Sequence, residues 1–299
     1  MDRLKFVPSS RGFLGLDEKE AMPPEEARAV IIPFGLEASV SYGQGTRNGP
    51  AAIIAASRQL EVFDEEFWLE PVRQFGLATL EAPNISGDQE KALTQIEALV
   101  GDCLTRGKFP LVLGGEHSVT AGAIRPFAKL YDSLTVVHFD AHADLRDGYE
   151  GNAYSHAAAI RRVLDHRACS VISIGVRSIS AVEIPFLEEN PGRISILWAK
   201  DRAQWDVKDV LGPYAGNPIY VTFDVDVFDS SVMPATGTPE PGGLFFSEVL
   251  TILRQVSEAG LLVGADIVEL APISGLHACD FLAAKLAYKL LSYALLARI

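Results

Sequence analysis

Short apolar runs alternate with amphipathic stretches along nearly the whole chain. Each run is rich in β-branched or aromatic residues, is apolar throughout, and is bounded by Gly, Pro or charged residues. This pattern is typical of parallel strands that are buried on both faces of a sheet. The predicted strands are Ala29–Phe34, Phe109–Leu113, Leu134–Asp140, Ser170–Gly175, Ile194–Leu197, Pro218–Asp224 and Leu261–Val268.

Helical patterns lie between these runs. The predicted helices are Asp88–Arg106, Val119–Tyr131, Ser155–His166, Ser247–Ala259 and Asp280–Leu296. Ser247, followed by Glu248, is the expected N-cap of one helix, and Gly107 and Gly260 stand where two helices should end. The alternation predicts a three-layer α/β fold with a doubly wound, mainly parallel sheet and helices on both faces. No linker-like tract interrupts it, so we expect a single domain over residues 1–299.

The composition is that of a globular protein with a sizeable core. Of the 299 residues, 48% are hydrophobic, and the three cysteines are too few and too widely spaced for a disulfide framework or a CxxC metal site. The first thirty residues hold no continuous apolar segment, and no uncharged apolar run approaches about 18 residues, the length of a membrane span. We therefore expect a cytoplasmic protein without a secretory leader or a membrane span.

The net charge of −13 disfavours a nucleic-acid backbone as a partner. The same charge would attract small cations, although many acidic proteins owe their charge to solubility alone. Charge therefore excludes one class of partner but does not by itself identify a ligand.

Polar clusters follow several of the predicted strands, where ligand sites of open α/β sheets lie. Residues two apart in an extended segment point to the same side, so Asp140, His142 and Asp144 should converge, and so should Asp224 and Asp226. With His117 from a neighbouring strand end, they form a set of four carboxylates and two imidazoles without a thiolate. Mixed oxygen and nitrogen ligation suits Mn²⁺ and argues against a structural zinc site.

Charge balance favours two metal ions over one. Four ionised aspartates carry four negative charges, which two divalent cations neutralise, whereas the bare carboxylates would repel one another. A single Asp-x-Asp could be a cap or a turn, but three clusters at successive strand ends favour a metal site. The segment Gly114-Gly115 lacks the P-loop and GxGxxG spacings, so its glycines are expected to permit a tight turn that points His117 inward.

Four segments together resemble the ureohydrolase (arginase/agmatinase) family. They are Gly-Gly-Glu-His-Ser at 114–118, Phe-Asp-Ala-His-Ala-Asp at 139–144, Phe-Asp-Val-Asp at 223–226, and Gly-Thr-Pro followed by Gly-Gly-Leu between 237 and 244. The resemblance extends from Gly43–Pro50 to the last helix. It implies that two manganese ions are bound per chain, with Asp140 and Asp224 bridging them. One ion would be held by His117, Asp140, Asp144 and Asp224, and the other by Asp140, His142, Asp224 and Asp226.

The resemblance also assigns catalytic roles. Glu269 matches the glutamate that binds the guanidinium group, His156 the histidine that shuttles protons, and Asp144 would relay a proton during hydrolysis. Asn152, in the loop after the second motif, is a candidate substrate ligand. Of the other histidines, His138 is expected in the core and His166 at the surface, while His277 could either line the mouth of the site or lie outside it.

The resemblance implies that the substrate is a small cationic guanidino compound, which would be cleaved to urea and an amine. Arginases read the amino-acid end of arginine through an Asn, Thr and Ser loop, but here Arg146 replaces the asparagine, and Asp147 and Glu150 add negative charge. The loop resembles the agmatinase branch, which implies agmatine, cleaved to putrescine in polyamine biosynthesis, or aminopropylagmatine, cleaved to spermidine. Guanidinobutyrate and arginine are the alternatives.

Two other classes of protein share parts of this pattern. A zinc deacetylase of related fold, acting on acetylated polyamines, would use one metal ion and would not need both His117 and the second Asp-x-Asp. A catalytically silent relative should have lost at least one metal ligand, and none is missing here. Members of the family tend to form trimers or hexamers, so the resemblance also implies a homo-oligomer.

Overall fold

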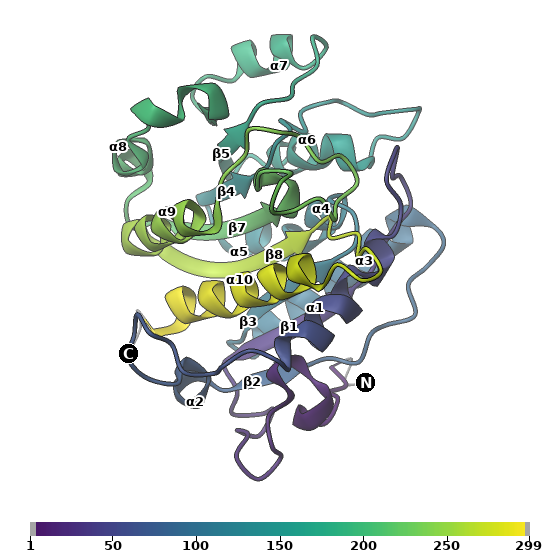
Figure 1. Cartoon of the computed structure of the whole chain (residues 1–299). Coiled ribbons are helices and arrows are strands. Elements are labelled where there is room, and N and C mark those ends of the chain that lie inside the picture. Colours follow the sequence, from purple (N-terminus) through teal and green to yellow (C-terminus); the bar gives the residue numbers. More distant parts are fainter. Residues whose placement is uncertain (1–3, 297–299) are drawn as a thin grey trace.

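A single eight-stranded sheet forms the centre of the molecule (Figure 1). The computed structural model describes residues 4–296. Every strand pairing is parallel, and the strand order is β2-β1-β3-β8-β7-β4-β5-β6. The strands are β1 (Ala29–Phe34), β2 (Leu77–Thr79), β3 (Phe109–Gly114), β4 (Leu134–Phe139), β5 (Cys169–Val176), β6 (Ile194–Trp198), β7 (Pro218–Asp224) and β8 (Leu261–Val268). The doubly wound fold predicted from the sequence is confirmed.

Helices cover both faces of the sheet. One face carries α1 (Gly49–Ser57), α2 (Pro71–Phe75), α8 (Val207–Leu211), α9 (Phe246–Ala259) and α10 (His277–Leu296). The other carries α3 (Gln89–Thr105), α4 (Val119–Ala123), α5 (Arg125–Leu130), α6 (Ala159–Leu164) and α7 (Ile184–Glu189). The side chains of successive strand residues point to opposite faces of the sheet. Ile31 packs into the core on one face and Ile32 into the core on the other. This is why the strands are apolar throughout.

The structure corrects the helix prediction in three places. Within the expected helix Ser155–His166, a 3-10 turn over His156–Ala158 precedes α6. The expected helix Val119–Tyr131 is divided at Ile124 into α4 and α5, because Pro126 has no backbone N–H to continue the ladder. Ser247 is not the N-cap of α9: the helix begins at Phe246, and Glu248 accepts a hydrogen bond of 2.8 Å from the backbone N–H of Phe245. Gly107, with a φ of 66°, follows the end of α3 as expected.

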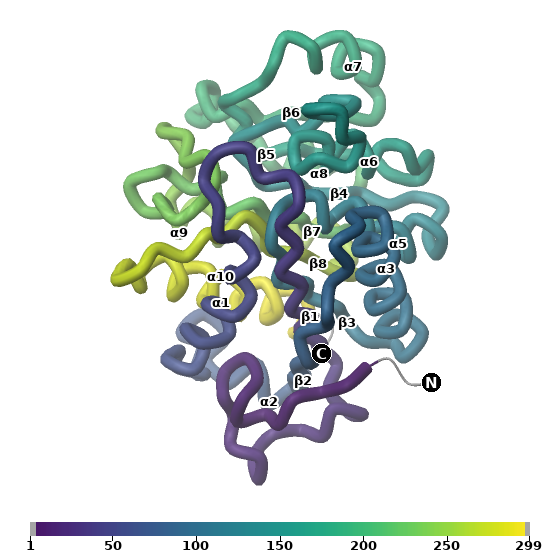
Figure 2. Tube along the Cα trace, turned by 90° about the vertical axis from the view of Figure 1, so that its right-hand side faces the viewer, coloured from purple at the N-terminus to yellow at the C-terminus, as the bar shows by residue number. Residues whose placement is uncertain are grey.

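The strand order places four strand ends side by side in the middle of the sheet. β8 lies between β3 and β7, and β4 is the next strand, so the segments after these strands meet at one edge. The loop of residues 35–48 between β1 and α1 extends over the same edge (Figure 2). It is joined to the segment after β7 by a hydrogen bond of 3.1 Å from the Gly43 N–H to the Gly237 carbonyl.

Two other expectations concern the chain as a whole. Across residues 4–296, no helix combines the length and the apolar character that crossing a bilayer requires. Cys103, Cys169 and Cys279 are buried free thiols, as their number and spacing indicated.

Candidate functional site

A close backbone approach aims His117 into the site. A Cβ built on Gly115 would lie 1.9 Å from the carbonyl oxygen of Leu36, so no larger residue fits this turn. The Glu269 N–H donates to the Gly115 carbonyl at 2.8 Å, and the Glu269 carboxylate in turn accepts from the His117 N–H at 2.6 Å. These two hydrogen bonds attach the turn after β3 to the end of β8. The tight turn points His117 inward, which is the role expected of Gly114 and Gly115.

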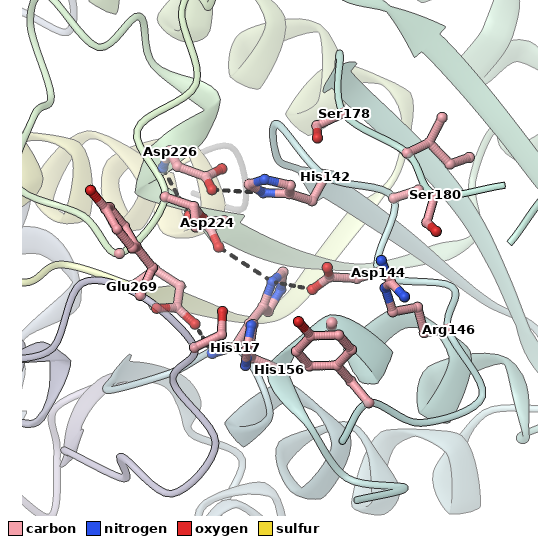
Figure 3. A pocket seen from close by; sticks show the side chains of 18 of the residues that line it. His117, His142, Asp144, Arg146, His156, Ser178, Ser180, Asp224, Asp226 and Glu269 are labelled. Carbon is pink, nitrogen blue, oxygen red and sulfur yellow. Dashed lines mark hydrogen bonds and ion pairs between the residues drawn. The ribbon is translucent and has the colours of Figure 1, made fainter. Parts of the chain in front are cut away.

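The His117 ring defines the first metal subsite. Its Nδ1 lies 3.1 Å from a carboxylate oxygen of Asp140, 3.1 Å from one of Asp144 and 3.4 Å from one of Asp224. This nitrogen is buried and has no hydrogen bond of acceptable geometry. Figure 3 shows the ring between Asp144 and Asp224. An unpartnered imidazole nitrogen facing three carboxylates is an arrangement that suits a bound cation.

A buried network below His117 fixes which ring nitrogen faces the carboxylates. The His117 Nε2 lies 3.0 Å from the hydroxyl of Thr222, whose proton is donated to Asp266 at 2.7 Å. The hydroxyl must therefore accept from an Nε2–H group, which leaves the Nδ1 lone pair for a metal ion. Asp266 also accepts from Tyr220 and Thr120. Neither Thr222 nor Asp266 was found by sequence reasoning, because both lie inside apolar strands without a motif.

The second subsite is built around His142 and shares Asp140 with the first. The Nδ1 atom of His142 lies 2.9 Å from Asp226 and 3.4 Å from Oδ1 of Asp140, whereas Oδ2 of Asp140 faces His117. The two oxygens of Asp140 thus point into different subsites, as a bridging carboxylate would. Asp224 contributes Oδ2 to the first subsite, while its Oδ1 accepts from the Asp226 N–H at 2.8 Å.

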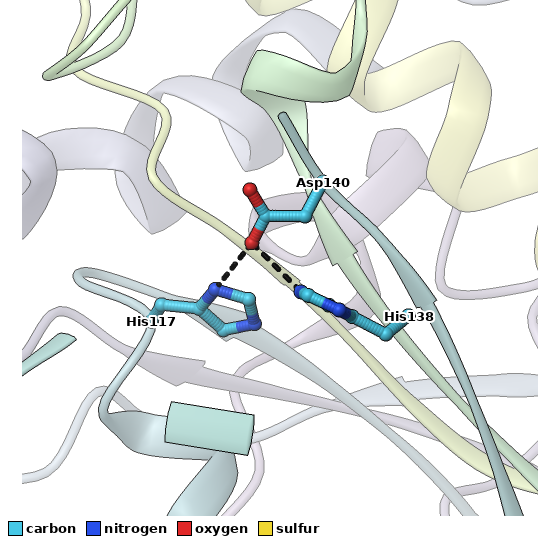
Figure 4. A group of neighbouring side chains, drawn as sticks. All are labelled: His117, His138 and Asp140. Atoms are coloured by element: carbon cyan, nitrogen blue, oxygen red, sulfur yellow. Dashed lines mark hydrogen bonds and ion pairs between the residues drawn. The ribbon is translucent and has the colours of Figure 1, made fainter. Parts of the chain in front are cut away.

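His138 contacts the site directly, which the sequence did not reveal. It is fully buried, as expected of a core histidine, but its Nε2 lies 2.7 Å from Oδ2 of Asp140 and its Nδ1 2.9 Å from Ser173 (Figure 4). His138 therefore orients the shared carboxylate, a position that supports a metal ligand. Its location inside β4 gave no indication of this contact.

The charges of the cluster need to be compensated by protons or by cations. Burial alone would lower the pKa of His117, but the carboxylates of Asp140, Asp144 and Asp224 raise that pKa well above its ordinary value. Burial and the charges of Asp226 and Asp140 raise the pKa of Asp224 well above its own. Carboxylates this crowded are stable only with protons or cations among them. The donor set therefore fits two divalent ions, in the two subsites that share Asp140.

Asp144 and Glu269 have a backbone conformation that is unusual for residues with a side chain. Their φ values are 52° and 65°, which lie in the left-handed region. Such conformations cost about 1–3 kcal/mol each and persist where the surroundings impose them. Here the left-handed conformation accompanies side chains that face the cavity, which is consistent with a functional reason for keeping the strain.

A cavity opens beside the cluster, and it contains the expected catalytic residues (Figure 3). Glu269 and His156 both line it, together with five of the predicted metal ligands, His117, His142, Asp144, Asp224 and Asp226. Burial and the nearby charge of Glu116 raise the pKa of Glu269 to about 8. A bound cation would favour its ionised form, so this carboxylate is suited to a positively charged ligand.

The loop after Asp144 differs from the expectation. Asp147 is exposed and pairs with Arg162 on α6 at 2.6 Å, so it is not directed at the cavity. Asn152 does not line the cavity either: its amide donates to Gln89 at 2.7 Å, and its oxygen accepts from the Tyr154 N–H at 2.9 Å. The role of Asn152 as a substrate ligand thus stays a prediction, and the arrangement of its side chain does not support it.

Other residues of the loop form the cavity wall instead. The wall includes Arg146, whose guanidinium carbon lies 4.9 Å from the centre of the Tyr149 ring, and Tyr149 itself. Glu150 is exposed and does not line the cavity. Of the remaining histidines, His277 is exposed at the start of α10, outside the cavity, and His166 is half-buried just after α6.

Arg177 is a further supporting residue that had no signal in the sequence. Its guanidinium donates to the Gly175 carbonyl near the end of β5 and to backbone carbonyls after β7, including that of Asp226 at 2.7 Å. It also donates to the carbonyls of Glu240 and Pro241. The side chain therefore attaches the end of β5 to the segment after β7, which carries Asp226 of the second subsite.

Comparisons with known proteins agree with this geometry. Residues 27–292 match the model of the arginase family. The N(1)-aminopropylagmatine ureohydrolase of Synechocystis sp. is 35% identical over 97% of this chain and 95% of its own length. The agmatinase of Bacillus cereus is 38% identical over 83% of this chain and 85% of its own. The crystal structure of agmatine ureohydrolase of Thermoplasma volcanium superimposes with a TM-score of 0.82 at 30% identity, covering 95% of this chain and 94% of that one.

Proposed function

The chain belongs to the arginase family, and we propose that it is an agmatinase-like amidinohydrolase. It would hydrolyse a guanidinium C–N bond and release urea and an amine. The observation that carries this proposal is the cluster at the strand ends, where His117 and His142 each direct a ring nitrogen toward two or more carboxylates and Asp140 is shared between them.

The two ions are proposed to be Mn²⁺. The donors are four carboxylates and two imidazoles, a set that suits Mn²⁺ better than a thiolate-binding metal. His117, Asp140, Asp144 and Asp224 would hold one ion, and Asp140, His142, Asp224 and Asp226 the other. When bound, two such ions supply an activated water by lowering its pKa from 15.7 toward about 7.

Glu269 would orient the guanidinium group. A guanidinium carries N–H donors in a fixed planar arrangement and stays protonated at physiological pH, so a carboxylate facing it forms strong charge-assisted hydrogen bonds. One Glu269 oxygen is held by the His117 N–H at 2.6 Å. The carboxylate is therefore fixed relative to the first subsite, and a guanidinium group bound to it would lie beside the cluster.

Asp144 and His156 would move protons. Asp144 lies at the first subsite and faces the cavity, where it can accept a proton released during attack on the guanidinium carbon. His156 lines another part of the wall and belongs to neither subsite, so it is available to protonate the departing amine. Acid–base help of this kind contributes about 10²- to 10⁴-fold to a rate.

We propose agmatine or aminopropylagmatine as the substrate. The support comes from two relatives that share a third or more of their residues with this chain over most of its length and are named for these compounds. The expected contribution of Asp147 is not part of this support, because that carboxylate pairs with Arg162. The buried carboxylate of Glu183 is the cavity feature that suits a cationic tail, whereas the Tyr149 ring already has the Arg146 guanidinium over it.

One observation favours a second candidate. Among residues 4–296, Arg146 forms no ion pair with a carboxylate, although its guanidinium lies in the cavity wall over Tyr149. An unpaired cation there would attract a carboxylate, which agmatine lacks and guanidinobutyrate carries. Guanidinobutyrate is therefore the alternative substrate that the geometry itself suggests.

A panel of urea assays tests both candidates. With agmatine, aminopropylagmatine, guanidinobutyrate and arginine side by side, we expect kcat/KM for agmatine to exceed that for arginine by at least about 10²-fold, or about 2.7 kcal/mol. If guanidinobutyrate exceeds both polyamine-type substrates, the agmatine assignment is wrong. In that case Arg146→Gln should lower kcat/KM for guanidinobutyrate and spare agmatine.

Two wider properties complete the proposal. We propose a homo-oligomer, a trimer or a hexamer, in the cytoplasm. The three buried free thiols are compatible with a reducing compartment. The molar mass in solution, measured by light scattering during size exclusion, tests the oligomeric state. A mass of one chain, 32.3 kDa, would contradict a homo-oligomer.

A further inference from the structure

A buried carboxylate that is neither a metal ligand nor a substrate ligand fixes the loop of residues 35–48 to the site. Glu116 is fully buried at the turn after β3. One of its oxygens accepts from the backbone N–H groups of Ala38 and Ser39, both at 2.6 Å. The carboxylate therefore holds the loop just before Val40, Ser41 and Tyr42, which line the cavity.

The other Glu116 oxygen determines where the Ser39 hydroxyl proton goes. This oxygen lies 2.7 Å from the Ser39 Oγ and also accepts from Ser118 at 2.6 Å and from Gln89 at 3.2 Å. A serine hydroxyl has one proton to donate and two lone pairs. Since Ser39 donates its proton to Glu116, its Oγ can only accept hydrogen bonds from its other neighbours.

Those other neighbours both belong to His156. The Ser39 Oγ accepts from the backbone N–H of His156 at 2.9 Å and lies 3.3 Å from the ring Nδ1. Because the hydroxyl is an acceptor here, Nδ1 must carry a proton to form this contact. In the neutral ring the lone pair is then on Nε2. His156 lines the cavity, so its unprotonated nitrogen is the one free to exchange protons there.

We propose that Ser39 and Glu116 are positioning residues that fix the tautomer and orientation of His156. The Glu116 carboxylate orients the Ser39 hydroxyl, and this hydroxyl accepts a hydrogen bond from Nδ1–H of His156. The proton on Nδ1 leaves Nε2 unprotonated. Nε2 is then the atom that takes up, and later delivers, the proton that His156 transfers. The inference rests on the proposed proton-transfer role of His156. A second hydroxyl, that of Ser155, lies 3.4 Å from Nδ1. It has no hydrogen bond to Glu116 in the described part of the chain, and it provides a matched control.

The test is urea release from agmatine by the Mn²⁺-loaded enzyme. Ser39→Ala should lower kcat by about tenfold, the effect of about one hydrogen bond, with KM within about twofold of wild type and metal content unchanged. Ser39→Thr, which keeps the hydroxyl, should recover most of the loss. Ser155→Ala should have a kcat close to wild type. A tenfold loss in Ser155→Ala with wild-type activity in Ser39→Ala would overturn the proposal.

A double-variant cycle separates positioning from a structural effect on the loop. In the His156→Ala background there is no ring to orient, so Ser39→Ala should cause no further loss of kcat. If Ser39→Ala lowers kcat tenfold in that background too, the serine acts independently of His156 and the proposal is wrong. The proposed function fails differently: wild-type enzyme would then release no urea from any compound of the panel, whatever residue 39 is.

Discussion

At the residue scale, Asp140 is where the two subsites meet. Its Oδ2 faces His117 and its Oδ1 faces His142, at 3.1 and 3.4 Å from the ring nitrogens. The spacing of the Asp-x-His-x-Asp motif predicts that these side chains share one side of an extended segment. It does not reveal that His138, two residues earlier, also contacts Asp140. A histidine inside an apolar strand looks the same in the sequence whether it only fills the core or also orients a metal ligand.

Asp140→Asn removes a charge that both subsites use. We expect metal content to fall below two ions per chain and kcat/KM to fall by more than about 10²-fold, as measured by elemental analysis and urea release. Asp147→Asn is a suitable control, since Asp147 is exposed and pairs with Arg162, and it should resemble wild type. Two retained ions with wild-type turnover in Asp140→Asn would show that the assignment of this residue is wrong.

His156→Ala separates catalysis from metal binding. The ring lines the cavity but is not part of either subsite, so metal content should stay at the wild-type level while kcat falls by about 10²-fold. Single-turnover measurements with agmatine, alongside elemental analysis of the same sample, check both quantities. Loss of metal in this variant would mean that His156 is a ligand instead of a proton carrier.

At the element scale, strands were easier to predict than helices. A strand buried on both faces is an uninterrupted apolar run, and seven of eight were found; β2 has three residues and lies at the edge. Helix α1 was missed because Gly49–Ser57 is apolar on all sides and so has no helical periodicity. The loop 35–48 was unpredictable for another reason: distant residues, such as Glu116, determine its path.

Helix α10 is attached to the rest of the molecule by a buried lysine. The Lys289 ammonium, 1% exposed, lies 2.8 Å from Asp64, 3.2 Å from Glu65 and 3.4 Å from Glu66. Asp64 is itself fully buried. Removing one partner of a buried ion pair leaves an uncompensated charge, which is more damaging than losing the pair altogether.

Lys289→Met should therefore lower the free energy of unfolding by about 3–5 kcal/mol. Adding Asp64→Asn should restore part of the loss, because no buried charge then remains at residue 64. Lys208→Met, which removes an exposed lysine 3.9 Å from Glu258, should leave the denaturation midpoint unchanged. Urea denaturation followed by circular dichroism measures all three; equal midpoints for Lys289→Met and Lys208→Met would contradict the prediction.

At the scale of the whole molecule, the topology converts separate motifs into one site. The motifs after β3, β4, β7 and β8 are far apart in the chain, and the strand order places their ends together. Their positions after parallel strands predicted this convergence. Residues that reach the cavity from loops, such as Arg146 and Tyr149, could be located only in three dimensions. The net charge of −13 would favour the approach of a cationic substrate.

The measurement that tests the dinuclear metal centre most directly is urea release from agmatine as Mn²⁺ is titrated into metal-free protein. Two subsites that share Asp140 predict that activity is absent without metal, rises with Mn²⁺, and reaches its plateau at two ions per chain. Chelation should then abolish it. Full activity with a single tightly held ion, or no urea at two ions per chain with any compound of the guanidino panel, would contradict the dinuclear hydrolase described here.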